Sequence, residues 1–519
     1  KSKQVRSPHS AVDPIMLEIF NNRFMYIAEQ MGTILQKTAY SVNIRERRDF
    51  SCALFDVKGN LIANAPHIPV HLGSMEECVK AVIKRQPKMY QGDAYLINNP
   101  YLGGTHLPDV TLISPFFYKN SKPAFYLASR AHQADIGGIT PGSMPAQSKS
   151  IEEEGVMITD FKLLDKNKLR ETEYLNLLST AKYPARNTHN NFADIQAQIA
   201  ANYKGQQEMI KLIEEYNLGT VNAYVRHIQT NATFCVKQVV KKLKDGRYKL
   251  VMDNGIVINV SVRVARLNNT ITLDFSGSSV HQSNNFNTPK AVCYAAILYV
   301  FGTLVEKNIP LNHGCLKPIK IIIPKASFLH PVKPAAVVAG NVEVSQNIVD
   351  ALFAALNCLA ASQGTMNNIS FGNETLQYYE TLCGGAGAGP GFNGASAVHT
   401  HMTNSLLTDP EVLEKRFPLY VKQYKIRKNS GGAGQWNGGD GIIREIEFLQ
   451  SMVVSILSSR RQQPPFGMHG GKNAACGENW LIKASGSKQK LSGTVTVEVK
   501  NGDRIIIKTP GGGGWGAQE

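Results

Sequence analysis

Two apolar runs joined by a short polar turn constrain the fold of this chain more than any other feature of its sequence. The runs cover residues 110–117 and 124–131, and the turn-like segment 118–123 (Y-K-N-S-K-P) joins them. This pattern predicts an antiparallel β-hairpin, in which the start of the first strand lies beside the end of the second. Asp109 and His132 stand at those two ends, so we expect their side chains to meet.

A second imidazole lies close to this pair, because His106 is three residues before Asp109. Two histidines and one carboxylate form a three-ligand set that leaves coordination positions open, as catalytic metal sites do. Glycines at positions 103, 104, 137 and 138 let the backbone pass close to a bound species. In the alternative interpretation, His106 caps a loop, Asp109 accepts backbone N–H bonds and His132 is an ordinary core histidine. The residues alone leave both interpretations open.

Asp135 is the next acidic residue after the hairpin. It could orient a ligand, or act as a general base near bound water. It could equally cap the loop before Gly137.

Two histidine pairs elsewhere resemble parts of a site. His399 and His401 would share one face if their segment were a strand, and could then add a base or a substrate donor; the alternative is a polar strand edge in solvent. His67 and His71 mimic a helical H-x-x-x-H motif, but Pro69 between them breaks a helix. We therefore disfavour the second pair as a metal site.

Nucleotide-binding and serine-hydrolase motifs are missing. The glycine run at 384–391 contains Pro390 and does not open a helix, as a dinucleotide fingerprint must. The sequence has no G-x-x-x-x-G-K-[ST] motif and no G-x-S-x-G motif. ATP binding by this chain alone is therefore unsupported.

Composition narrows the class of protein. The 519 residues are 43% hydrophobic and 18% charged, which is ordinary for a soluble chain of several domains. The eight cysteines include no C-x-x-C pair and predict free thiols in a reducing compartment, so we expect a cytoplasmic location. No segment reaches the ~20 apolar residues of a membrane span. The net charge of +16 is dispersed, which fits a solvated surface or an acidic partner subunit better than nucleic acid.

Periodicity predicts an α+β fold with mixed, largely antiparallel sheets, packed helices and several subdomains. The expected helices cover 14–38 (capped by Asp13), a segment from the capping box at Ser74 to Arg85, 194–243 and 345–361; the expected strands, besides the hairpin above, cover 51–55, 61–63, 248–252, 256–264 and 270–275. The expected domains are an N-terminal α+β metal-binding domain (1–190), a helical segment (191–245), an antiparallel β-rich domain (246–340), and a helix followed by a Gly-rich β domain (341–519).

Long motifs spread over almost the whole chain resemble the hydantoinase B family, the B subunit or domain of N-methylhydantoinase and 5-oxoprolinase. They include N-I-R-E-R-R-D-F-S at 43–51, H-L-G-S-M at 71–75, G-G-T-H-L-P-D at 103–109, A-H-Q-A-D-I-G-G at 131–138, G-N-V-E-V-S-Q at 340–346, H-T-H-M-T-N at 399–404 and T-P-G-G-G-G-W-G at 509–516.

The resemblance implies a chemistry. In this family and the related acetone- and acetophenone-type carboxylases, a partner A subunit binds ATP with Mg and phosphorylates the substrate. The B-type subunit then completes ring opening or carboxylation. The related carboxylases hold a divalent metal through residues that correspond here to His106, Asp109 and His132, and Zn, Mn or Fe would suit this ligand set.

We therefore expect the B subunit of an ATP-dependent cyclic amide hydrolase acting on a hydantoin or 5-oxoproline. Asp135 and His401 are the expected catalytic residues. The expected assembly is a hetero-oligomer with an A-type subunit, which could contain a homodimeric core. The alternatives are a subunit of an ATP-dependent ketone carboxylase, and a non-catalytic scaffold subunit with a structural metal.

Overall fold

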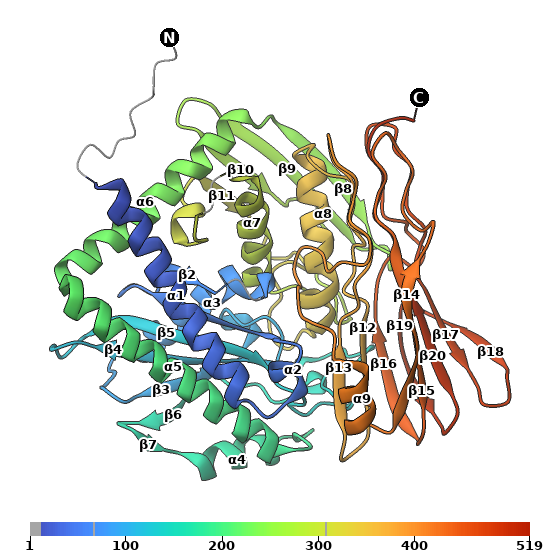
Figure 1. Ribbon diagram of the computed structural model, residues 1–519, viewed down its shortest axis with the longest axis horizontal. Coiled ribbons are helices and arrows are strands. Elements are labelled where there is room, and N and C mark those ends of the chain that lie inside the picture. The colour runs from blue at the N-terminus through green and yellow to red at the C-terminus, as the bar shows by residue number, and fades with distance from the viewer. Residues whose placement is uncertain (1–11, 66–67, 307–308, 519) are drawn as a thin grey trace.

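The computed structural model describes residues 12–65, 68–306 and 309–518, and these have the expected α+β architecture. Their strands form four sheets, largely antiparallel, with helices packed against them (Figure 1). The exception to the antiparallel pattern is the parallel pairing of β10 with β11. The predicted fold class is confirmed.

The first sheet contains the predicted hairpin at its centre. Its seven strands lie in the order β2-β1-β5-β4-β3-β6-β7 and all pair antiparallel. They are β1 (Phe50–Phe55), β2 (Leu61–Asn64), β3 (Ala94–Ile97), β4 (Asp109–Phe117), β5 (Pro123–His132), β6 (Phe161–Asp165) and β7 (Lys168–Leu169). Strands β1, β4 and β5 are almost entirely buried, so both faces of the sheet are covered.

Long helices cover one face of this sheet (Figure 1). Helix α1 (Pro14–Thr38) begins where predicted, because the Asp13 side chain accepts a hydrogen bond from the Ile15 N–H. Helices α5 (Thr188–Tyr216) and α6 (Leu218–Lys242) fill the segment predicted to be helical, with Asn217 at the break between them. The short α2 (Val42–Arg45), η3 (Ile151–Glu154) and α4 (Glu171–Ser179) complete this region.

Helix α3 (Leu72–Arg85) packs against the same strands from another direction and contacts α7 (Lys290–Leu304). A 3-10 turn, η1 (Pro69–His71), leads directly into α3, so the helix starts before Ser74. The Ser74 hydroxyl donates to the carbonyls of Val70 and His71 inside the helix. The predicted capping box is therefore wrong, since Pro69 already begins the first helical turn.

The second sheet has the strand order β11-β10-β9-β8 and includes the three predicted strands of this region. Its members are β8 (Gly246–Val251), β9 (Val257–Ala265), β10 (Thr270–Asp274) and β11 (Ile319–Ile322). Helix α8 (Ser345–Ala355) packs on β8 and β9 and ends six residues earlier than predicted, and one turn of π-helix, η5 (Gly340–Val344), precedes it. Two 3-10 turns, η2 (Pro100–Leu102) and η4 (His313–Cys315), lie in loops.

The C-terminal region holds two antiparallel sheets that share one apolar core. One has the order β13-β12-β16-β19 and the other β14-β15-β20-β17-β18. Their elements are β12 (Asn368–Gly372), β13 (Gln377–Glu380), α9 (Pro410–Arg416), β14 (Leu419–Arg427), β15 (Gly441–Phe448), β16 (Met452–Leu457), β17 (Glu478–Ile482), β18 (Lys488–Leu491), β19 (Thr494–Val499) and β20 (Arg504–Lys508).

The glycine runs of this region pack backbone against backbone. A Cβ atom placed on Gly385 would lie 1.9 Å from the carbonyl oxygen of Gly439, and one on Gly512 would lie 1.9 Å from that of Ala386. No side chain fits at such positions. The glycine run at 384–391 thus allows close packing of its backbone against the C-terminal glycines.

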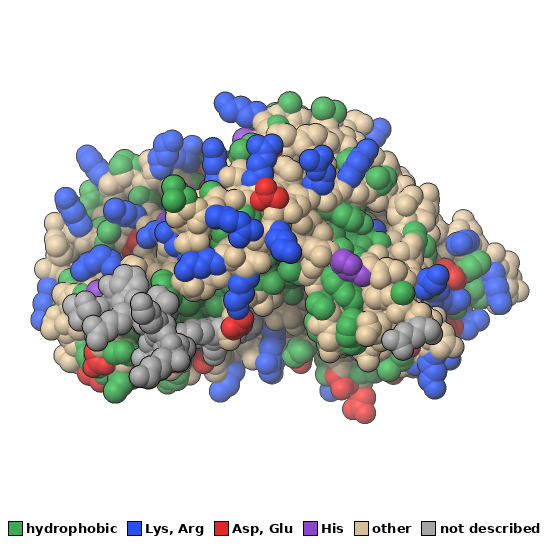
Figure 2. All heavy atoms as spheres, turned by 90° about the horizontal axis from the view of Figure 1, so that it is seen from above, with side chains coloured by type: hydrophobic (Ala, Val, Ile, Leu, Met, Phe, Trp, Pro, Cys, Tyr) green, Lys and Arg blue, Asp and Glu red, His purple; other side chains and the backbone are tan. Residues whose placement is uncertain are grey.

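Basic side chains are spread over the face of the molecule shown in Figure 2. Lys and Arg are separated there by other side chains, so the positive charge of this face does not gather into one stripe. No helix among the described residues is long and apolar enough to cross a membrane.

Candidate metal centre

The β4–β5 hairpin brings the predicted ligands together. Asp109, the first residue of β4, pairs directly with His132, the last residue of β5. The turn before β4 holds His106 beside them, because the Asp109 N–H donates to the His106 carbonyl at 3.2 Å. The hairpin predicted from the two apolar runs is therefore confirmed, including its register.

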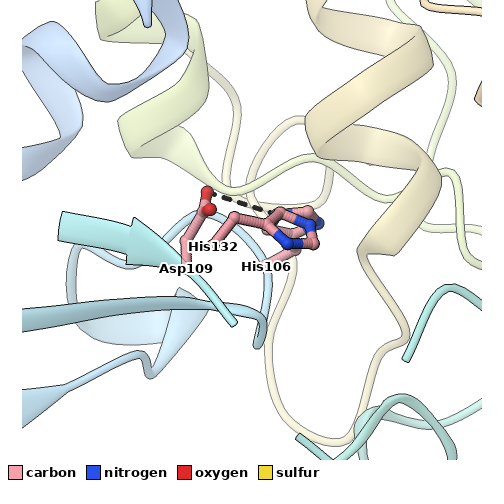
Figure 3. Close-up of side chains that lie close together, drawn as sticks. All are labelled: His106, Asp109 and His132. Atoms are coloured by element: carbon pink, nitrogen blue, oxygen red, sulfur yellow. Dashed lines mark ion pairs between the residues drawn. The ribbon is translucent and has the colours of Figure 1, made fainter. Parts of the chain in front are cut away.

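His106, Asp109 and His132 form a buried group (Figure 3). One ligand atom from each residue can be chosen so that all three lie within 4.8 Å of one another. Among the described residues, this is the one group of three or more His, Cys, Asp or Glu side chains with that property. The two imidazole rings lie edge to face, with centroids 5.1 Å apart.

Hydrogen bonds orient the His132 ring for metal binding. Its Nδ1 lies 3.0 Å from the Gln133 carbonyl and 3.2 Å from the side-chain amide nitrogen of Asn43, and these two contacts orient the ring. Its Nε2 is buried and has no hydrogen-bond partner among the described residues, so this nitrogen is available to a ligand. Metal-bound histidines are typically held in this way. Burial lowers the pKa of His132 from 6.5 to about 4, with the nearby Asp49 carboxylate opposing the shift, which favours the neutral ligand form.

The Asp109 carboxylate is held through one oxygen and leaves the other free. Its Oδ2 accepts from the Thr105 hydroxyl at 2.6 Å and lies 3.2 Å from Nε2 of both His71 and His106. Burial alone would raise its pKa, but His106 and His71 hold the pKa of Asp109 well below its usual value. Its Oδ1 is buried and unpartnered.

These unpartnered atoms test whether the residues fit a metal. Nδ1 of His106, Oδ1 of Asp109 and Nε2 of His132 are all buried and have no hydrogen-bond partner in the described part of the chain. Leaving one such group unsatisfied costs about 1–3 kcal/mol, so three neighbouring residues with such atoms are unusual without a ligand. The pocket they line has a volume of about 20 Å³, enough for about one ion or water. The donor set and the space fit a divalent cation.

His71 and Asp49 also line this pocket, and the sequence did not point to either of them. His71 was disfavoured because of Pro69, yet its Nε2 contacts Asp109 and its Nδ1 lies 3.0 Å from the Ser51 hydroxyl. That judgement concerned only the His67/His71 pair as a metal site, and it stays a prediction. His67 lies outside the described residues.

Asp49 is the second missed residue. It also lines the pocket, and its backbone carbonyl accepts from the His132 N–H at 3.0 Å. It precedes β1, which pairs with β5, just as Asp109 opens β4. That shared position, an aspartate at the start of a buried strand, is the sequence signal that could have found it.

Asp135 lies in a different environment. Its Oδ1 accepts from the N–H groups of Gly137 and Arg186, and its Oδ2 accepts from the Gly142 N–H and the Arg186 guanidinium at 3.0 Å. Burial raises its pKa, with Arg186 opposing the shift. These contacts are those of the loop-capping alternative. The catalytic role of Asp135 stays a prediction.

His399 and His401 do not lie on a strand. His401 has a left-handed backbone, with φ of 55°. Even so, both histidines line one cavity, next to the residues Met402 and Thr403 that line the metal pocket. The role of His401 as a catalytic residue also stays a prediction.

Comparison with known proteins places the chain in a family. A family model described as Hydantoinase B/oxoprolinase matches residues 13–518. The chain belongs to this family. It is 45% identical over 541 residues to 5-oxoprolinase 1 of Arabidopsis thaliana, covering 99% of this chain and 43% of that protein.

Two solved structures share the fold. An ATP-dependent caprolactamase from Pseudomonas jessenii matches with a TM-score of 0.87 and 24% identity, over 98% of this chain and 92% of that one. An acetone carboxylase matches with a TM-score of 0.83 and 17% identity, over 97% of this chain and 76% of that one. The chain thus spans less than half of the plant 5-oxoprolinase, but nearly the full length of the matching caprolactamase chain.

Proposed function

We propose that this chain is the hydrolytic, metal-dependent half of an ATP-dependent cyclic amide hydrolase that opens the ring of a hydantoin or 5-oxoproline. The observation that carries the proposal is that His106, Asp109 and His132 meet in one buried pocket and that each has a polar atom without a hydrogen-bond partner among the described residues. Membership of the Hydantoinase B/oxoprolinase family supports the substrate class.

His106, Asp109 and His132 would hold one divalent cation, with Zn, Mn and Fe all suited to the donor set. When bound, such a cation supplies Lewis acidity that polarises a carbonyl and makes water more acidic. The protein keeps the ligands in place: Thr105 and His71 fix Oδ2 of Asp109, and the Gln133 carbonyl fixes the His132 ring.

A carboxylate is available to accept a proton at this pocket. Asp49 is 6% exposed, lines the pocket beside His132 and has no side-chain hydrogen bond to any of the described residues. A general base must stand within reach of the water it deprotonates. Asp49 is therefore our choice for that role, ahead of Asp135, whose oxygens are all engaged.

ATP would be used by an A-type module. The plant 5-oxoprolinase extends well beyond the matched part, which favours an A-type region fused to the same polypeptide. The caprolactamase chain matches over 92% of its length, which fits a separate subunit instead. Either arrangement supplies the activated ring carbonyl to this chain.

The test combines the full protein or its complex, including the A-type module, with candidate substrates. We expect ADP release and ring opening with 5-oxoproline or hydantoin. Turnover with acetone and bicarbonate in place of these rings would favour the ketone carboxylase instead. Turnover with neither class of substrate would contradict both enzyme functions.

His132→Ala separates catalysis from a scaffold role. We expect the variant to fold, to assemble with the A-type module and to lose both metal and ring opening. Loss of folding together with the metal would support a structural metal in a non-catalytic subunit.

A further inference from the structure

A second cavity adjoins the segment that borders the metal pocket. Met402 and Thr403 line the metal pocket, whereas His399, Thr400 and His401 line a cavity of about 430 Å³. This volume is within the range of small-molecule sites, about 300–1,000 Å³. The metal pocket, by contrast, has room for little more than an ion.

The His401 ring is oriented by a buried carboxylate. Its Nε2 lies 3.1 Å from Oδ1 of Asp350, which can only accept while ionised, so Nε2 carries a proton. In the neutral ring, Nδ1 is then an acceptor. Nδ1 lies 3.5 Å from the Tyr299 hydroxyl, which is too long for a strong hydrogen bond. Nδ1 of His401 is therefore free to accept a better donor.

The protein maintains this arrangement at a cost. Asp350 is held by the Ser362 N–H at 3.0 Å and by the Arg460 guanidinium at 3.4 Å. Both His401 and Arg460 adopt left-handed backbones, with φ of 55° and 60°. Non-glycine residues pay about 1–3 kcal/mol for such conformations, which persist where the surroundings enforce them.

His399 supplies a second polar atom. Its Nδ1 is buried and has no hydrogen-bond partner among the described residues. Burial lowers its pKa to about 4, so the ring is neutral at pH 7 and can donate from one nitrogen. The cavity therefore offers an acceptor on His401, and His399 supplies a donor when its unpartnered Nδ1 carries the ring proton.

The rest of the lining limits the ligand. Among the described residues that line this cavity, none is Lys, Arg, Asp or Glu, and most are apolar, such as Leu304, Phe353 and Val398. A charged group inside would find no counter-ion and would pay its desolvation cost. The part of a ligand that enters is therefore uncharged.

We propose that this cavity binds the ring of a small cyclic amide, whose N–H donates to Nδ1 of His401 and whose carbonyl accepts from His399. In a ring amide these two groups are cis and lie on the same side of the ring, whereas in an open-chain trans amide they point in opposite directions. The choice of a ring amide rests on the proposed function. The existence of the site rests on the contacts above.

The test uses two ligands that differ in one hydrogen-bond donor. 2-Pyrrolidinone has the ring N–H, and N-methyl-2-pyrrolidinone lacks it. Titration of the full chain, followed by ligand-observed NMR in the presence of a chelator and without ATP, should show the N–H form binding about tenfold more tightly, the effect of about one hydrogen bond. Equal affinities, or no binding of either, would overturn the proposal.

Matched variants locate the site. His401→Asn removes the ring while asparagine tolerates the left-handed backbone, and it should abolish the preference for the N–H form. His469 is a suitable control, because it is also left-handed, with φ of 53°, but is exposed and does not line the cavity. His469→Asn should leave both affinities unchanged.

Binding is measured without metal or ATP, so it is independent of the proposed reaction. Retained binding with no ring opening by the complex would count against the proposed function alone. Binding lost in His132→Ala but kept in His401→Asn would place the ligand in the metal pocket and overturn the cavity site. If His401→Asn does not fold, the affinities of the two ligands for the unmodified chain still test whether the chain recognises the ring N–H.

Discussion

Asp109, the first residue of β4, and Asp135, in the loop after β5, are both buried aspartates beside the same hairpin, yet their surroundings differ. Asp109 has one oxygen engaged by Thr105 and two histidines, and its other oxygen is free. Asp135 has both oxygens engaged, each by a backbone N–H of a glycine and by Arg186. A saturated carboxylate holds a loop, whereas an unsaturated one beside unpartnered imidazoles is arranged for a ligand.

The largest expected effect is on chemistry. Asp109→Asn removes an anionic ligand, so we expect metal to be lost and ring opening by the full complex to fall by about 100-fold or more. Stability of the metal-free chain should also fall, because the neutral amide loses the charge that Oδ2 presents to Thr105, His71 and His106. Parallel assays of activity, metal content and urea unfolding check this prediction. Full activity in a metal-free Asp109→Asn protein would contradict the proposed role of Asp109 as a metal ligand, the role that distinguishes it from Asp135.

Asp135→Asn should act on stability without loss of the metal. An amide cannot accept all the hydrogen bonds that Asp135 accepts, and it leaves the Arg186 charge without its buried partner. We expect the free energy of unfolding to fall by about 3 kcal/mol, measured by urea denaturation. The folded fraction should keep its metal. A stable Asp135→Asn protein without metal would show that this carboxylate serves the metal site.

A smaller effect is expected from the hydroxyl that holds Asp109. Thr105→Val removes the 2.6 Å hydrogen bond to Oδ2 and should weaken metal affinity about 10–100-fold, as titration with a competing chelator would show. Thr140→Val is the matched control, because the Thr140 hydroxyl is also buried, lies in the Asp135 loop and makes no hydrogen bond. Equal metal affinity in the two variants would contradict the proposal that the Thr105 hydroxyl positions Asp109 for metal binding.

The pH dependence of the metal-free chain should differ in sign between the two aspartates. The pKa of Asp109 is lowered in the folded state, so it contributes stability above pH 3.8 that is lost as the pH falls through its depressed pKa. The pKa of Asp135 is raised, so its ionisation costs stability above that pKa, and this cost disappears as the pH falls towards 3.8. Carboxyl ¹³C NMR in the presence of chelator should show Asp135 protonating first on acidification. The reverse order would contradict both assignments.

Local patterns predicted the hairpin and its ligand set. Residues 110–117 and 124–131 have the apolar pattern of strands, and the polar segment between them has the composition of a turn. Antiparallel pairing of the two strands then determines which end residues lie side by side. The start of the first helix was predicted from Asp13 and Pro14, and its end from the spacing of its apolar residues.

Contacts between distant segments could not be predicted in this way. Asp49 reaches the pocket because β1 pairs with β5, and His71 reaches it because η1 and α3 pack over the sheet. The hydrophobic periodicity of one segment does not show which distant segments it contacts. His399 and His401 share a cavity through a left-handed turn that the alternation of side chains did not indicate.

The central claim is that His106, Asp109 and His132 bind a divalent metal. Elemental analysis of the full chain, purified without chelator, tests it most directly, alongside His132→Ala and the control His330→Ala, whose ring also has a buried unpartnered Nδ1 but does not line the metal pocket. We expect about one Zn, Mn or Fe per chain in the unmodified protein and in His330→Ala, and none in His132→Ala. A metal-free unmodified chain, or metal retained in His132→Ala, would contradict the account.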